Sequence, residues 1–434
     1  MKKRLIWVLP VALLLAGLYW LSSDERPSEE TRLWQDWHDH HLGQPGRAWL
    51  WLLGMTAPAG EWPDEAGQRW LEQAARELRD ADDRAVAMLA GSQMPWHDRM
   101  LALPDTRSLE PLLACRTGAA CEPIATVLAE HAELLTRFRD WPVQTRSLHV
   151  AAPDSRNIPP LQGLIAAIQL DRLAHLSLLR DSRPEQARAM AEHTDRQLRA
   201  MLTEPPNLIV LMVGLRMMSD QVAWLLALHD DGLIELEPDE PMLADLAGIG
   251  DALEATLRGE FGLSYRFNHA IDESHLAESA GWWEHFLFRW LFKPQMTLNR
   301  TGDLYRWVAG LDQPADLAAV SRGDAALWEP PWQPRNLFAY GDYNMLPEPR
   351  PLLTYIARVH DLTARLALAR AWLAEPVLDE VTLRRLAKDN PYGRDFGIEY
   401  DEAEETLCFG GPLEDDRQFR CISVADQPAP NRSR

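Results

Sequence analysis

Apolar residues recur at helical spacing over most of this chain. Between residues 28 and 310 they return every three or four positions, as at Trp70, Leu71, Ala74 and Leu78. This period places them on one face of an α-helix. Proline marks many of the short breaks between such segments and favours a helix start or a turn. The pattern therefore predicts successive helices of about 20 residues that stack as antiparallel hairpins.

No fixed repeat period is present, so the expected fold class is mainly α, an irregular array of antiparallel helical hairpins. The most apolar segment, 208–228, contains Arg216, Asp220 and Gln221. Because these side chains are too polar for lipid, we predict a helix buried inside the protein. Ser182 and Glu185 have the spacing of a capping box and predict that a helix begins there.

The pattern changes near the C-terminus. Residues 396–400, 406–409 and 418–424 alternate apolar and polar side chains, and turn-forming residues separate them. Alternation with period two is typical of strands. We expect a small antiparallel β tail at the C-terminus.

An uncharged apolar run, 5–21, follows the basic start Met1-Lys-Lys-Arg4 and precedes Asp24 and Glu25. At about 1.5 Å per residue it approaches the thickness of a bilayer's hydrocarbon core. The basic residues before it place the N-terminus in the cytoplasm. A cleaved signal peptide is the alternative, but residues 17–23 contain no A-x-A-like site. We expect an uncleaved anchor in a bacterial inner membrane, crossed once, with the bulk of the chain periplasmic.

These features define the expected domain organisation. Proline and aromatic residues crowd 323–349, which favours a long loop or link. The expected parts are a cytoplasmic N-terminus (1–4), a transmembrane anchor (5–21), a periplasmic helical domain (22–322), a Pro/Trp-rich link (323–349), a helical hairpin with the small sheet (350–425) and a flexible tail (426–434).

Charge excludes one class of partner. The chain has 44 Lys and Arg against 65 Asp and Glu, a net charge of −21. Phosphate backbones require a basic surface, so we expect no nucleic-acid partner.

Four cysteines fall into two local pairs, Cys115 with Cys121 and Cys408 with Cys421. Four cysteines allow three connectivities, and proximity favours the two local disulfides. An oxidising periplasm would form them. Neither pair has zinc-ligand spacing, so no metal is expected there.

Common phosphate-binding and hydrolase motifs are absent, and one stretch, His269 to Glu284, gathers titratable groups. Asp272, Glu273 and Glu278 are its candidate catalytic carboxyls, close in sequence to Trp282 and Trp283. Catalysis would require one of these carboxyls to lie in a cleft with a raised pKa. A solvated helix start is the alternative that we favour.

Two other constellations could hold cations. His38 and His41 share a helical face and with Asp39 could bind Zn²⁺ or Cu²⁺, although a solvated polar face is the simpler interpretation. The acidic Gly-rich turn 410–416 could hold Ca²⁺, although its spacing is not that of an EF-hand loop. We expect neither a metal nor a cofactor.

Three resemblances accompany these patterns. The ordered motifs in 290–305, 355–366 and 390–401 resemble a group of membrane-anchored proteobacterial proteins of unknown function, over residues 285–425. Glu273-Ser274 resembles the Glu-Ser pair of lytic transglycosylases, periplasmic helical enzymes in which the Glu is the general acid; Gly281-Trp-Trp-Glu284 replaces their Gly-x-Met-Gln element. The β tail is similar to that of type II secretion pseudopilins, but their N-terminal pilin helix is missing, so their function does not carry over.

The sequence thus favours an interaction or scaffold role in the envelope, with an envelope protein as partner, over an enzymatic one. The alternative is a periplasmic hydrolase acting on a cell-wall or glycan substrate through Asp272, Glu273 or Glu278.

Overall fold

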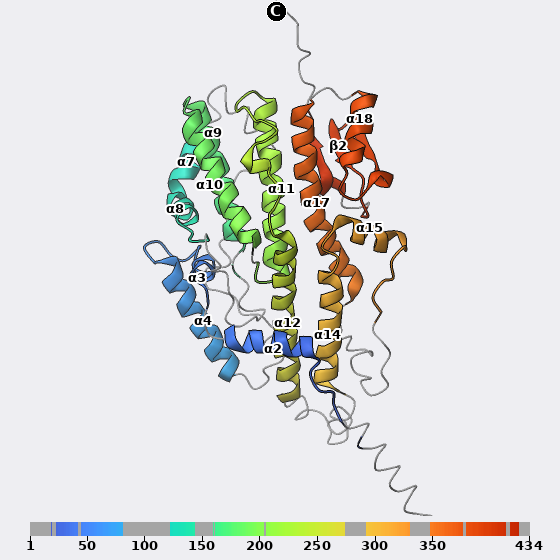
Figure 1. Cartoon of the computed structure of the whole chain (residues 1–434). Helices are drawn as coiled ribbons and strands as arrows, with labels where there is room; N and C mark the ends of the chain where they lie inside the picture. The colour runs from blue at the N-terminus through green and yellow to red at the C-terminus, as the bar shows by residue number, and fades with distance from the viewer. Residues whose placement is uncertain are drawn as a thin grey trace, which may run out of the picture.

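The computed structural model describes residues 19, 23–41, 45–80, 122–143, 159, 161–203, 205–273, 292–329, 348–375, 379–413 and 417–424. Within these ranges the protein is mainly helical, with one small sheet near the C-terminus, which confirms the predicted fold class. Figure 1 shows most helices running roughly along one long axis. Apart from Tyr19, the apolar run 5–21 lies outside the described residues, and the expected domain organisation stays a prediction.

The first helices pack closely through small residues and tryptophans. They are α2 (Glu29–His41), α3 (Arg47–Leu53) and α4 (Pro63–Asp80). A Cβ on Gly67 in α4 would lie 2.0 Å from the Leu50 carbonyl oxygen of α3, so only glycine permits this crossing. Trp49, Trp51 and Trp70 are almost completely buried here, so their large apolar rings form part of the core.

Four further helices follow, and buried hydrogen bonds join α8 and the residues after it to α3. They are α7 (Glu122–Glu130), α8 (Ala132–Arg139), α9 (Leu161–Arg180) and α10 (Pro184–Thr203). The indole of Trp51 donates to the Arg137 carbonyl, and that of Trp141 donates to the Ala48 carbonyl, each at 2.9 Å. Because each buried N–H finds an acceptor across the interface, the two indoles fix α3 against α8.

The predicted helix start at Ser182 differs from the structure. Ser182 has a positive φ of 59°, and the N–H groups of Ser182 and Arg183 donate to the carbonyls of Leu179 and Leu178. This is the Schellman pattern that ends a helix. Ser182 therefore terminates α9, and α10 begins two residues later.

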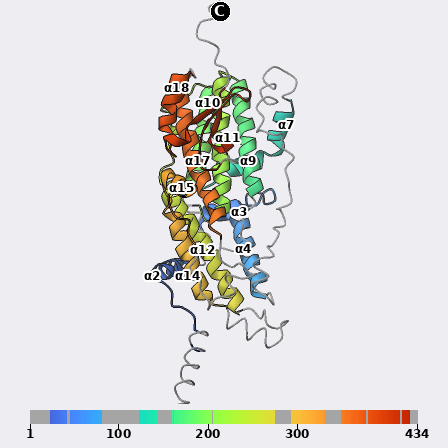
Figure 2. The ribbon, with the colours of Figure 1, turned by 90° about the vertical axis from the view of Figure 1, so that its right-hand side faces the viewer.

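The predicted buried helix is α11 (Leu208–Asp230). By length and composition alone this helix could cross a membrane. However, 61% of its most apolar 18-residue stretch is buried inside the protein. The Asn207 side chain caps its start by accepting from the Val210 N–H at 2.9 Å. It lies beside α9 and α17 (Figures 1 and 2).

The rest of the chain packs along and beyond α11. A 3₁₀ turn, η4 (Pro241–Leu243), leads into α12 (Ile249–Glu273), and α14 (Pro294–Ala309), α15 (Pro314–Arg322), α17 (Pro349–Ala374) and α18 (Glu380–Leu386) follow. In Figure 1 helix α2 crosses α12 and α14 near one end of the molecule, and the sheet and α18 lie at the other. One apolar core extends from Ala48 to Val424.

The predicted β tail is present. Strands β1 (Ile398–Asp401), β2 (Thr406–Phe409) and β3 (Cys421–Ser423) form an antiparallel sheet in the order β1-β2-β3. Cys408 pairs directly with Cys421 in the register, and a disulfide joins them, as predicted. The chain before β3 forms a 3₁₀ turn, η7 (Arg417–Arg420), where the sequence predicted strand.

A buried polar network attaches this sheet to α17. Asp361 is completely buried and lies 3.3 Å from Arg420 Nη1, and the Tyr392 hydroxyl donates to Asp361 Oδ1 at 2.6 Å. Arg420 also donates to the carbonyls of Phe409 and Leu413. Asp361 and Tyr392 belong to the motifs 355–366 and 390–401, and Arg420 belongs to the predicted strand 418–424, so distant parts of the sequence meet in one network.

Candidate functional site

Helix α14 forms hydrogen bonds with residues 24–28, which follow the apolar N-terminal run. The Asp24 carboxylate accepts the backbone N–H groups of Gln295 and Met296, at 2.9 and 3.1 Å. Both donors lie in the first turn of α14, where N–H groups have no partner inside the helix. Asp24 thus caps a helix 271 residues further along the chain.

Asn299 extends this attachment by one turn of α14. Its side-chain oxygen accepts the Ser28 N–H at 3.0 Å, and its amide donates to the Arg26 carbonyl at 3.0 Å and to Glu25 at 3.1 Å. Every polar atom of this buried amide is therefore used by residues 25–28. Together Asp24, Asn299 and their partners form what we call the N-terminal clamp.

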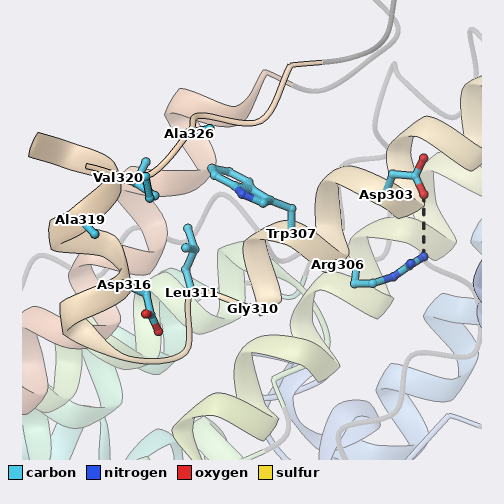
Figure 3. Close-up of a pocket in the computed structure, with 10 residues that line it drawn as sticks. Asp303, Arg306, Trp307, Gly310, Leu311, Asp316, Ala319, Val320 and Ala326 are labelled. Atoms are coloured by element: carbon cyan, nitrogen blue, oxygen red, sulfur yellow. Dashed lines mark ion pairs between the residues drawn. The ribbon is translucent and has the colours of Figure 1, made fainter. Parts of the chain in front are cut away.

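The same helix lines a surface pocket of about 530 Å³. This size falls within the range of about 300 to 1,000 Å³ that is typical of ligand sites. Trp307 projects from α14 toward Val320 of α15 and toward Ala326, and Leu311 rises beside it (Figure 3). The other lining residues are Asp303, Arg306, Gly310, Asp316, Ala319 and Ala325.

Charged side chains of the pocket lie at its rim. Arg306 is exposed and pairs with Glu30 of α2 at 2.8 Å and with Asp303 at 3.8 Å, so two carboxylates compensate its charge. Asp316 is exposed at the start of α15. Asp303 also pairs with Arg300 at 3.0 Å, so the charges at this part of the rim largely compensate one another. Because the lining is mostly apolar, the pocket suits an apolar group, and Asp316 could attract a positive charge beside it.

The end of α14, the turn after it and the short helix α15 form this pocket from neighbouring parts of the sequence. Trp307 and Leu311 are four residues apart and share one side of the chain as α14 ends at Gly310. Pro314 then begins α15, and Gly323, with a φ of 78°, ends it and turns the chain back across Trp307. The Trp-x-x-x-Leu spacing with a following proline is the only sequence signal for this site, and an ordinary helix corner gives the same signal.

The histidines predicted to lie on a solvated face do not all lie there. His38 is only 4% exposed and packs edge-on against Tyr265 of α12, whose ring also contacts His269 at 4.6 Å. The prediction was wrong for His38 because α2 lies across α12 and buries that side. Asp39 and His40 remain exposed, and the side chain of His41 lies outside the described residues.

The structure does not place the candidate catalytic carboxyls. Asp272 and Glu273 end α12, but their side chains lie outside the described residues, as do Glu278 and the Trp282–Trp283 pair. The same holds for Cys115, Cys121 and the carboxylates of the acidic turn, Glu414 to Asp416. Among described side chains, no group of three His, Cys, Asp or Glu is arranged to hold a metal ion.

Comparisons with protein-family models, with curated proteins and with solved structures find no match to this chain. We therefore infer function from the N-terminal clamp, the pocket beside Trp307 and the chemistry of the residues around them.

Proposed function

We propose that this chain is a single-pass inner-membrane protein whose periplasmic body binds an envelope protein partner. The basic N-terminus and the apolar run 5–21 support the anchor and its orientation. The Cys408–Cys421 disulfide supports an oxidising compartment. Scaffold or adaptor proteins of this kind act by holding a binding surface at a defined place.

One observation carries this proposal: a single helix, α14, holds both the N-terminal clamp and the pocket. Its first turns bind Asp24 and residues 25–28, and its last turn presents Trp307. A rigid helix would transmit the position of the anchor to the pocket. The pocket would then lie at a fixed height above the membrane, where a membrane-bound partner could reach it.

The pocket lining indicates what the partner presents. An apolar side chain fits beside Trp307, Leu311 and Val320, and a neighbouring Lys or Arg would lie near Asp316. Burial of one such apolar side chain contributes about 1.5 to 3 kcal/mol, enough for a transient contact when the two proteins share one membrane.

Site-specific photo-crosslinking in intact cells tests the pocket. A photoreactive residue at Ala326, which lines the pocket, should capture a defined partner, whereas one at Val381 of α18, which is 75% exposed, should not. Filling the pocket with Ala319→Trp should reduce capture about tenfold, the equilibrium effect of losing roughly 1.4 kcal/mol. Equal capture from both positions, or undiminished capture in the Ala319→Trp variant, would contradict the proposal.

The hydrolase alternative makes a different prediction in the same cells. Glu273→Gln should leave crosslinking and complementation of a deletion strain unchanged if the chain is an interaction protein. Loss of complementation with normal protein levels and normal crosslinking would instead favour catalysis by this carboxyl.

The proposed periplasmic location of the body can be tested independently through the second cysteine pair, Cys115 and Cys121. Peptide mapping without reductant, on protein isolated from its own envelope, should recover Cys115 linked to Cys121 as well as Cys408 linked to Cys421. An oxidising periplasm forms both because each pair is close in sequence. Free thiols at Cys115 and Cys121 in that preparation would argue against the predicted pairing, and free thiols at all four positions would argue against a periplasmic body.

A further inference from the structure

Three charged side chains of alternating sign follow one another along α14. Arg300, Asp303 and Arg306 are spaced by three residues and therefore lie toward one side of the helix. One carboxylate oxygen of Asp303 lies 3.0 Å from Arg300 Nη1, and the other lies 3.8 Å from Arg306 Nη2. A single carboxylate of α14 therefore pairs with two guanidinium groups of the same helix.

The residues that follow the apolar N-terminal run supply two further carboxylates. We call residues 24–30 the anchor segment. Its Glu25 lies 3.8 Å from Arg300. Its Glu30, in the first turn of α2, lies 2.8 Å from Arg306. These two glutamates and the three charged side chains of α14 form what we call the charge ladder, in which negative and positive groups alternate.

Two members of the charge ladder also line the pocket beside Trp307. They are Asp303 and Arg306, and Figure 3 shows the ion pair that joins them. Glu30 comes from α2, yet it compensates the charge of Arg306 at the rim. The anchor segment therefore contributes to the charge of a pocket that α14 and α15 form.

Attachment of the anchor segment sets the sign of the ladder's charge. With the segment in place, three carboxylates face two guanidinium groups, so negative charge is in excess by one. Without Glu25 and Glu30, the α14 part alone has one carboxylate and two guanidinium groups, so positive charge is in excess by one. Asp316 belongs to α15 and is common to both states. A difference of two charges at the rim of a binding site alters which charged groups it attracts.

The attachment of the segment can be weakened without a change of charge at the pocket. Asn299 is 5% exposed, and its neutral side chain binds the Ser28 N–H and the Arg26 carbonyl, each at 3.0 Å. Asp24 is charged, but its partner Gln295 lies about 16 Å along the helix from Arg306. Screening by salt acts over about 8 Å at physiological ionic strength, so the Asp24 charge has little direct effect on the pocket.

We propose that the attached anchor segment makes the pocket beside Trp307 selective for a positively charged group, and that detachment of the segment removes this selectivity. The partner group proposed above, an apolar side chain next to a Lys or Arg, would bind best while residues 24–30 lie on α14. Displacement of the membrane anchor relative to the body would detach them. This regulation rests on the proposed function because it concerns the same pocket, but the charge of the rim can be measured without a partner.

A cysteine placed in the pocket reports this charge. Ala326 lines the pocket and is exposed, so the Ala326→Cys variant of the purified full-length protein should react with small thiol reagents. The two probes are trimethylammonium-ethyl methanethiosulfonate, which is positive, and sulfonatoethyl methanethiosulfonate, which is negative. Both react with the same thiolate, so the ratio of their rates cancels differences in access and in thiol ionisation. The protein without the added cysteine gives the background.

The ratio of the positive to the negative reagent's rate should be highest with the anchor segment attached. Changing both Glu25→Gln and Glu30→Gln should lower the ratio about threefold to tenfold, and about 1 M salt should largely abolish the difference. Asn299→Ala changes no charge, but it should lower the ratio in the same direction because it detaches the segment. Glu29→Gln removes a charge beside Glu30 but outside the ladder, and it should change the ratio less than Glu30→Gln does.

Hydrogen exchange at the Ser28 amide, which donates to Asn299, shows independently whether the segment has detached. Faster exchange in Asn299→Ala together with a wild-type rate ratio would overturn the proposal. An unchanged ratio in the double glutamine variant would overturn it as well, whatever the state of the segment. If Asn299→Ala alone does not speed the exchange, Asp24→Asn is combined with it and the same two readings decide.

The rate ratios also separate this inference from the proposed function. Crosslinking from Ala326 that captures a partner, together with rate ratios that do not respond to the ladder variants, would reject only the control by charge. Rate ratios that respond as expected, without capture of any partner, would support the control by charge and reject the proposed partner.

Discussion

Asp361→Asn should lower the free energy of unfolding by about 3 to 5 kcal/mol, the cost of leaving one member of a buried ion pair without its partner. Asp361 is fully buried and Arg420 is 2% exposed, so water cannot replace the lost carboxylate charge. The change keeps the side-chain shape, which makes charge its main effect. Urea unfolding of the full-length protein, followed by circular dichroism, measures it.

Two variants separate charge from packing. Glu380→Gln breaks an ion pair with Arg384 in which both side chains are more than three-quarters exposed, and it should cost less than about 0.5 kcal/mol. The double change Asp361→Leu with Arg420→Met removes both buried charges and should recover much of the lost stability. A wild-type midpoint for Asp361→Asn would show that the pair does not hold the sheet on α17.

Acidification from pH 6.5 to pH 4 should remove roughly 3 kcal/mol of stability through one residue, His175. Burial lowers the pKa of His175 from 6.5 to about 4, and the Trp224 indole donates to its Nδ1 at 3.1 Å, which requires a neutral ring. Below pH 6.5 the unfolded chain binds a proton that the folded chain does not. The stability that depends on a neutral His175 is therefore fully present above pH 6.5 and is lost as pH falls toward 4.

The variant His175→Gln isolates this contribution, because a glutamine oxygen can still accept the Trp224 N–H but does not titrate. The difference in unfolding free energy between the wild type and this variant should shrink by roughly 3 kcal/mol between pH 7 and pH 4. Burial raises the pKa of Asp195 to about 6, which gives an opposite pH dependence, but that effect is common to both proteins and cancels in the difference. His40→Gln, at an exposed position, is the matched control. Parallel stability curves for wild type and His175→Gln would refute the assignment.

The sequence by itself determined the secondary structure that depends on neighbours along the chain. A period near 3.6 gave the helices, prolines marked several of their starts, and strict alternation with turn residues indicated the three strands. The buried character of α11 was predictable because its apolar residues surround the helix. The Cys408–Cys421 disulfide was predictable because a hairpin brings two nearby cysteines into register.

Only the tertiary structure decided which side chains meet across long sequence distances. Asp24 caps α14, and His38 is buried against Tyr265, because of how α2, α12 and α14 pack together. A periodic pattern shows that a helix has an apolar side, but not which helix covers it or which polar residues become buried in that contact. Packing selects those pairs through shape and solvation, and therefore the clamp could not be predicted from the sequence and the pocket could not be told from an ordinary helix corner.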